Sequence, residues 1–365
     1  MKESTKDIIL SAGFDINSDI EVPEAAKFTK DMKEKLLHIE NISRAEIKTL
    51  VNLFYQMQDI RKQLTEQIRS IDAAKSSTGE NNEVNVMVLQ WALKNMAATE
   101  KGLEDSLNLI CMSDPVGRWL LKITGIGPVL AAGCLCYFDI SNTNYATQFH
   151  SYAGLNDNNR PWLGRKKAEA IINEIVGSSK TIDDDMVVKI AAKTQWPYNY
   201  LMMNAYDDEK GRWSKADLIA AAAKIPYNKS LKCHMWKIGK SFQWVCNKPE
   251  SLYGRLFNER RVYEQQKNDN GDFADQAAAI LAEKNIGKNT TAYKEYSKGR
   301  LPAAHINARA MRWVEKIFLS HLFEEMYRVK YDKIPPRYYA LEHLEGKHNK
   351  EIEPEIPYDK VTGEA

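Results

Sequence analysis

The sequence predicts an all-α protein that combines a long antiparallel, coiled-coil-like helical hairpin with a multi-helix domain containing a helix-hairpin-helix. Two long runs, 43–71 and 84–110, keep apolar side chains at the spacing of one helix face. No stretch shows the apolar–polar alternation that is typical of a strand, and no internal repeat is found. Helices are therefore expected along nearly the whole chain.

The composition is that of a globular protein without a membrane span. The chain has 365 residues, of which 44% are hydrophobic and 27% are charged. No apolar run approaches the ~18 residues that a membrane helix needs, and the first residues lack the apolar region of a signal peptide. Five cysteines without a disulfide framework favour a reduced, cytoplasmic protein. Because the formal net charge is only +2, a face that binds nucleic acid must be a local patch.

Residues 1–40 are interpreted as an N-terminal arm and residues 41–112 as the helical hairpin. Ser43 and Glu46 have the spacing of a capping box, and a polar linker separates the two helices. Two interpretations remain open: a plain packing layer, or an arm for a homodimer formed through residues 43–110. The apolar positions that recur at helical spacing are Ile47, Leu50, Val51, Phe54, Met57, Ile60, Leu64 and Ile68, then Val88, Trp91, Leu93, Met96, Leu103 and Leu107.

The stretch ITGIGPVLAAG, residues 123–133, breaks an apolar run with two glycines and a proline before a third glycine closes it. Gly125 and Gly127 fit the turn of a helix-hairpin-helix, because glycine permits positive φ and close backbone approach. Pro128 suits the first turn of the second helix, where its missing N–H is not needed. The N–H groups at that helix start can then face a phosphate. The alternative is a purely structural turn between two packed helices.

The hairpin therefore supplies the first set of candidate DNA contacts. They are sequence-independent, because backbone N–H groups read phosphates and not bases. The residues predicted to contact DNA here are Lys122, Thr124, Gly125, Ile126, Gly127 and Val129.

The remaining chain is divided around this motif. Residues 113–164 are assigned to the helix-hairpin-helix core, and residues 165–225 to an inserted small helical subdomain with a helix-turn-helix-like segment. Residues 226–333 are expected to be C-terminal helices that complete the core. Residues 334–365 are punctuated by prolines and acidic, which predicts an extended tail. Ser214 has the position of a helix cap.

Residues 123–155, ITGIGPVLAAGCLCYFDISNTNYATQFHSYAGL, resemble the C-terminal domain of the DEDD insertion-sequence transposases, the IS-one-ten, bridge-RNA recombinase group. Asp139 matches the acidic residue that follows the hairpin in that family, and Tyr152–Leu155 match its Y-A-G-L-like segment. Residues 228–242 are similar to the family's basic helix. The resemblance implies DNA handling in recombination, in a mobile element or in a phage, and a coiled-coil arm ahead of the domain.

The sequence supports neither part of that family's catalytic apparatus. Residues 1–40 are too few for a RuvC-like nuclease domain with four metal-binding acids, and no serine follows the Y-A-G-L-like segment until Ser178. We therefore expect a DNA-binding protein without an identifiable catalytic site, cofactor or metal. The alternatives are an active transposase or recombinase with an unrecognised nucleophile, and a protein-interaction module that keeps the hairpin only as structure.

Basic clusters supply the remaining candidate contacts to duplex or branched DNA, with RNA left open. Residues 160–167 contain four cations, residues 224–240 contain five lysines and no acid, and a helix over 303–330 carries arginines on one face. For that helix the alternative is ion pairing with Glu315, Glu324 or Glu325. The candidate residues are Arg160, Arg165, Lys166, Lys167, Lys229, Lys232, Lys237, Lys240, Arg309 and Arg312.

Other chemistry-bearing side chains form no convincing site in the sequence. Cys134 and Cys136, with the Cys233–His234 pair, are the only candidates for metal binding, and their spacing does not match a zinc site. His150 and Ser151 are adjacent, but no third residue completes a nucleophilic arrangement.

Overall fold

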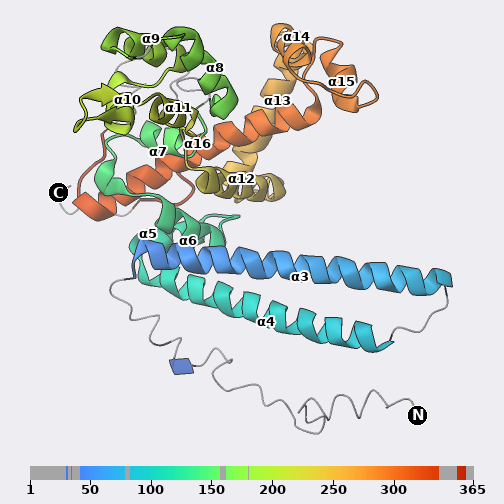
Figure 1. Ribbon diagram of the computed structural model, residues 1–365. Helices are drawn as coiled ribbons and strands as arrows, with labels where there is room; N and C mark the ends of the chain where they lie inside the picture. Colours follow the sequence, from blue (N-terminus) through green and yellow to red (C-terminus); the bar gives the residue numbers. More distant parts are fainter. Residues whose placement is uncertain are drawn as a thin grey trace, which may run out of the picture.

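The fold is described from a computed structural model, which covers residues 30–31, 34, 42–78, 83–156, 162–179, 181–336 and 352–358 (Figure 1). Helices dominate this part of the chain, so the prediction of an all-α protein is confirmed. The predicted N-terminal arm and most of the predicted tail lie outside the described residues. The helices are α3 (Arg44–Thr78), α4 (Glu83–Ser113), α5 (Pro115–Lys122), α6 (Pro128–Tyr137), η2 (Ile140–Asn142), α7 (Ala146–Tyr152), α8 (Gly164–Val176), α9 (Asp184–Thr194), α10 (Tyr198–Ala205), α11 (Lys215–Ala223), α12 (Lys229–Trp244), α13 (Leu252–Asp269), α14 (Ala274–Glu283), α15 (Thr291–Tyr296) and α16 (Ala303–Tyr331).

One small strand pair departs from the expectation of no strand. β1 (Tyr206–Asp207) pairs antiparallel with β2 (Arg212–Trp213), and Tyr206 lies opposite Trp213. Two residues per strand are too few to produce a readable alternation of apolar and polar side chains. None of the described helices is both long and apolar enough to cross a bilayer.

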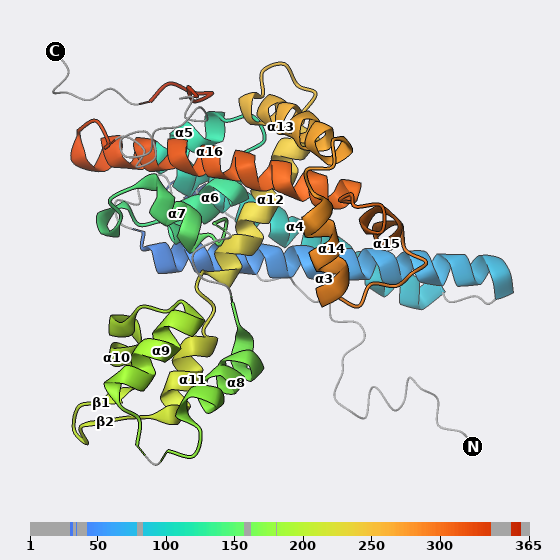
Figure 2. The same cartoon turned by 90° about the horizontal axis from the view of Figure 1, so that it is seen from above.

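α3 and α4 lie antiparallel and side by side, and they extend well past the rest of the molecule (Figures 1 and 2). The predicted capping box begins α3: the Ser43 N–H donates to Glu46 Oε2 at 2.8 Å, and the Glu46 N–H donates to Ser43 Oγ at 3.2 Å. Part-way along, Arg61 of α3 pairs with Glu100 of α4. The base of this arm buries its apolar residues in the main core, among them Val51, Phe54, Leu107 and Ile110.

The main core forms where α5, α6, α7, α12, α13 and α16 meet the base of the arm. α6 packs on both α3 and α4, and α12 packs on α6. The approach of α12 is close because Gly133 has no side chain: a Cβ there would overlap the ring of His234. In the same way, a Cβ at Gly239 would overlap the buried carboxyl group of Glu315 from α16. Burial raises the pKa of Glu315 to about 8.

Three buried histidines connect these elements. His150 on α7, His234 on α12 and His321 on α16 each bond a main-chain carbonyl through Nε2. Because a carbonyl can only accept, Nε2 carries the proton in all three rings. Burial lowers the pKa of each histidine to about 4, so all three are neutral at pH 7. The accepting carbonyls are those of Lys316, Leu130 and Ile352, at 2.9, 3.1 and 2.7 Å.

Helices α8 to α11 and the strand pair form a unit set to one side of the main core (Figure 2). This unit has its own apolar core, in which Trp196 donates from Nε1 to the carbonyl of Ala222 at 3.2 Å. Asp183 caps α9 and Ser214 caps α11 through their side-chain oxygens. The residues inserted between α7 and α12 therefore fold around contacts of their own. The buried residues of this core are Ala168, Ile172, Val176, Val187, Ile190, Trp196, Leu201, Ala205, Trp213, Leu218, Ile219, Ala221 and Ala222.

Candidate nucleic-acid interface

A tight turn over residues 123–127 joins α5 to α6. α5 begins at Pro115, with the Asp114 side chain accepting the Gly117 N–H at 2.8 Å. It ends where Ile123 becomes extended, at φ −73° and ψ 126°. Gly125 then adopts a φ of +99°, which L side chains rarely adopt, so glycine is needed there. The turn thus brings the chain directly to the start of α6.

The two glycines of this turn face different surroundings. Gly125 lies against the last turn of α12, where Ser241 Oγ donates to its carbonyl and where a Cβ on Gly125 would meet Val245. Gly127 is exposed, and a Cβ built on it would meet nothing within 4 Å. Its φ of −92° and ψ of 176° are open to any residue. One side of the turn is therefore buried against α12 and the other side faces solvent.

The start of α6 has backbone donors without a partner. Among the described residues, no hydrogen bond accepts the N–H of Gly127, Val129 or Leu130, and no side chain caps the helix. Such groups carry the partial positive charge of the helix N-terminus. An oxygen anion at the exposed Gly127 would meet the start of this helix, where such donors favour anions.

Some of the predicted hairpin residues are accessible to a ligand, and others are buried or already hydrogen-bonded within the protein. Lys122 is exposed at the end of α5, next to the turn. Ile126 and Val129 bury their side chains in the main core, and the Ile126 N–H donates to the Ile123 carbonyl. The predicted DNA contact of Ile126 does not fit this arrangement, because its side chain is buried and its N–H already has an acceptor. For Thr124 the N–H is also occupied, by a carboxylate from the far end of the chain.

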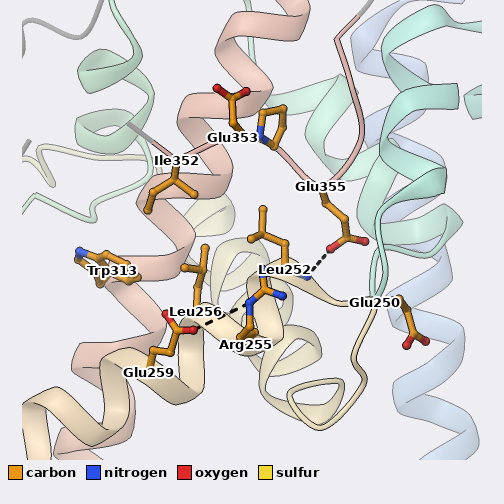
Figure 3. A pocket seen from close by; sticks show the side chains of 10 residues that line it. Glu250, Leu252, Arg255, Leu256, Glu259, Trp313, Ile352, Glu353 and Glu355 are labelled. Atoms are coloured by element: carbon orange, nitrogen blue, oxygen red, sulfur yellow. Dashed lines mark hydrogen bonds and ion pairs between the residues drawn. The ribbon is translucent and has the colours of Figure 1, made fainter. Parts of the chain in front are cut away.

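That carboxylate belongs to residues 352–358, which we call the strap. Glu355 accepts the Thr124 N–H at 2.6 Å with one oxygen and the Leu252 N–H, at the start of α13, at 2.8 Å with the other. Figure 3 shows Glu355 pointing toward Leu252 at the edge of an open groove. Trp119 of α5 donates from Nε1 to the Ile356 carbonyl at 3.1 Å and stacks on Tyr358. The strap thus joins α5, the turn and α13.

The sequence predicts an extended tail in this region but not its docking. Alternating glutamates and prolines carry no helix or strand period, so the pattern gives no partner. The only local signal is the apolar spacing of Ile352, Ile356 and Tyr358, which pack on the main core.

Replacing Glu355 by glutamine is expected to loosen the turn from the strap. The charged acceptor of two N–H groups is lost, and hydrogen bonds to charged groups contribute about 1.5–3 kcal/mol each. Amide hydrogen exchange should therefore become at least tenfold faster at Thr124 and Leu252. Glu353→Gln is the matched control, because Glu353 is exposed in the same strap. Unchanged exchange in Glu355→Gln would show that the carboxylate does not hold the turn.

The four lysines of α12 do not share one environment. Lys229 is exposed, and Lys232 lies over the ring of Tyr227. Lys237 is half-buried over the ring of Tyr55 from α3, and burial lowers its pKa to about 8. Lys240 donates to Gln243 at 2.9 Å. Lys237 therefore differs from the other three lysines, because its ammonium group lies against Tyr55 of the arm.

The cluster after the Y-A-G-L-like segment is only partly described. Arg165, Lys166 and Lys167 are exposed in the first turn of α8, in the unit with its own core. Arg160 lies outside the described residues. The first turn of a helix is an unfavourable place for cations, so these residues are not there to stabilise α8.

The arginines of α16 are engaged in the interior. Arg309 pairs with Glu264 of α13 at 2.7 Å and lies over the ring of Phe273. Arg312 is close enough to the buried Glu315 to lower the pKa that burial raises. Arg309 therefore has an ion-pair partner, as the alternative predicted, but that partner is on another helix and not among the glutamates of α16. A helical wheel of α16 alone does not contain this information.

The groups with catalytic potential also have structural partners. Asp139 pairs with Arg44, and this hydrogen bond lowers the pKa of its carboxyl group. His150 is turned toward α16, whereas Ser151 is exposed and accepts from Asn156 at 3.0 Å. Cys134 is fully buried. Within the described residues, no group of three or more histidine, cysteine, aspartate or glutamate side chains could hold a metal ion.

Comparison of the chain with protein-family models, with curated proteins and with solved structures gave no match in any of the three.

Proposed function

We propose that the protein binds DNA through the phosphate backbone at the start of α6. The observation behind this proposal is that no described group accepts the N–H groups of Gly127, Val129 and Leu130 at the start of the helix, where Gly127 is exposed. A phosphate oxygen satisfies these donors and the partial charge of the helix at once. Lys122 stands beside the turn and adds a full positive charge.

The resemblance to the DEDD insertion-sequence transposases supports DNA as the anion, since it centres on this turn. Two lysines of α12, the exposed Lys229 and the partly exposed Lys240, extend the basic surface on the helix that packs against the turn. Backbone contacts carry no base information, so binding should be independent of sequence. We propose binding without strand cleavage as the function, in recombination or in the DNA of a mobile element or phage.

The arm is proposed to pair two copies into a homodimer that holds two DNA segments. Its α4 helix exposes Met87, Val88 and Trp91 toward solvent, an unusual concentration of apolar side chains on an external helix face. Sedimentation velocity measures whether the protein is a dimer. The wild-type protein should sediment as a dimer and Trp91→Glu as a monomer.

The test of DNA binding is a salt titration with two unrelated duplexes of equal length. Fluorescence anisotropy should give similar affinities for both, falling steeply as salt rises. Lys122→Gln should reduce the slope of log affinity against log salt by about one, since one phosphate contact is lost. Lys284→Gln, at an exposed lysine after α14, is the control. Affinity that does not change with salt, or a tenfold preference for one duplex, would contradict the proposal.

A further inference from the structure

The exposed face of α12 combines tryptophan and lysine at regular spacing. Trp236, Lys240 and Trp244 are separated by four residues each, so that neighbours lie one turn apart. Trp236 is 56% exposed and Trp244 is 81% exposed. Lys240 Nζ lies 5.8 Å from the centre of the Trp236 ring. We call these three residues the α12 face.

Charge favours an anionic ligand for the α12 face. α12 contains four lysines and neither aspartate nor glutamate. On its packed side, Gly239 lies against the carboxyl group of Glu315, which is buried. The charge of Asp59, on the arm, interacts with Lys237, which does not belong to the α12 face. A ligand on the α12 face therefore meets lysine charge and two aromatic rings.

The last turn of α12, which ends at Trp244, packs against the turn that leads to the proposed phosphate site. Ser241 of the last turn of α12 donates to the Gly125 carbonyl, and a Cβ on Gly125 would meet Val245. Trp244 lies between these two residues in the chain and points to solvent. A nucleic-acid strand held at the start of α6 can therefore continue along α12 toward Trp236, about 12 Å further along the helix axis.

Exposed tryptophans beside lysines fit unpaired bases better than a duplex. Bases within a duplex are stacked on each other, and only their edges are accessible in the grooves. An unpaired base presents a whole face, which can stack on an indole ring while lysine contacts the phosphate. The two rings are about 80° apart around an ideal helix, so each can take a separate base.

We propose that the α12 face is a stacking site for unpaired bases of single-stranded DNA, next to the phosphate site at the start of α6. The proposal rests on the proposed function and specifies its substrate as a duplex that continues into a single strand. Two stacked bases should raise affinity for such a tailed duplex at least tenfold over a blunt duplex.

The experiment compares a blunt duplex with the same duplex carrying a single-stranded tail of about ten nucleotides. Wild-type protein should bind the tailed DNA at least tenfold more tightly by fluorescence anisotropy. Trp236→Ala/Trp244→Ala should lose this difference while its affinity for blunt duplex changes less than twofold. The conservative Trp236→Phe/Trp244→Phe variant should keep most of the difference. Tyr263→Ala is the control, at an aromatic side chain that is 43% exposed on α13.

The outcomes separate this inference from the proposed function. Equal affinity of wild-type protein for blunt and tailed DNA, or an equal loss on both in Trp236→Ala/Trp244→Ala, overturns the stacking site and leaves backbone binding intact. A tail of RNA that binds tenfold more tightly than DNA overturns the assignment to DNA. Absence of salt-dependent binding to blunt duplex overturns the proposed function instead. Circular dichroism of each variant shows that the fold is retained, as expected for exposed positions.

Discussion

Replacing Gly127 by aspartate is expected to abolish most DNA binding without harming the fold. Gly127 is the N-cap of α6, at φ −92° and ψ 176°, and a Cβ there has open space. Aspartate is among the preferred N-cap residues, because its side chain accepts the free N–H groups of the first turn. Stability should rise by about a few tenths of a kcal/mol relative to glycine. Affinity for duplex should fall at least tenfold, since a fixed anion now occupies the phosphate site.

Serine at the same position provides the matched control. Gly127→Ser can accept the same N–H groups but adds no charge, so its affinity should lie between those of wild type and Gly127→Asp. Thermal unfolding measures the stability of each variant, and fluorescence anisotropy on the same preparation measures its affinity for DNA. Together they distinguish a loss of folding from a loss of binding. If Gly127→Asp binds duplex as tightly as wild type, the start of α6 is not the phosphate site. Gly125 is unsuitable for this test, because its φ of +99° and its contact with α12 make substitutions destabilising.

A steep loss of stability is expected below pH 6.5. His150, His234 and His321 have pKa values of about 4 in the folded protein, below the 6.5 expected when unfolded. As the pH falls from 6.5 to 4, the unfolded chain therefore takes up protons that the folded protein does not. Stability from these groups is complete above pH 6.5 and is lost as the pH falls.

Glu315 changes stability in the opposite direction. Its folded pKa of about 8 lies above the ordinary value of 4.5, so its contribution is complete below pH 4.5 and is lost as the pH rises to 8. Between pH 5 and 6, the unfolded chain binds up to three more protons than the folded protein at the histidines and one fewer at Glu315. The unfolded chain therefore holds up to two more protons in total. The unfolding free energy should then change by roughly 2 kcal/mol per pH unit. Maximum stability is expected near pH 6.5.

Urea unfolding at half-unit steps from pH 5 to 8 measures this profile. In Glu315→Gln the decline between pH 6.5 and 8 should disappear, while the loss below pH 6.5 remains. Histidine titration by NMR gives the three pKa values independently. A profile that is flat between pH 5 and 6.5 would mean that the three rings are not held neutral by burial.

Local features of the fold can be predicted from the sequence because their causes are local. The capping box at Ser43 and Glu46 is a relation between residues three apart, and the side-chain caps at Asp183 and Ser214 likewise act within one turn. Helical periodicity identifies Val51 and Phe54 as buried. It does so because burial on a helix repeats with the helix turn.

Partners that come from distant elements could not be predicted. Lys237 has the spacing of an exposed lysine on α12, yet it lies over Tyr55 of α3. Arg309 pairs with Glu264, 45 residues earlier. Such pairs depend on how helices cross, and a single sequence does not encode the crossing in any local pattern. This is why the turn is the better-predicted part of the candidate site and the basic clusters are the poorer part.

The strap has a consequence for the order in which the site is completed during synthesis. The acceptor of the Thr124 N–H is Glu355, which is 231 residues later in the chain. At about 5–20 residues per second, a ribosome makes that acceptor roughly 10–50 s after Thr124. During this interval the Thr124 N–H in the turn lacks its carboxylate, and once Leu252 has been made its N–H at the start of α13 lacks the same carboxylate. A molecule interrupted in this window would carry an additional anion-binding surface that the finished protein keeps covered.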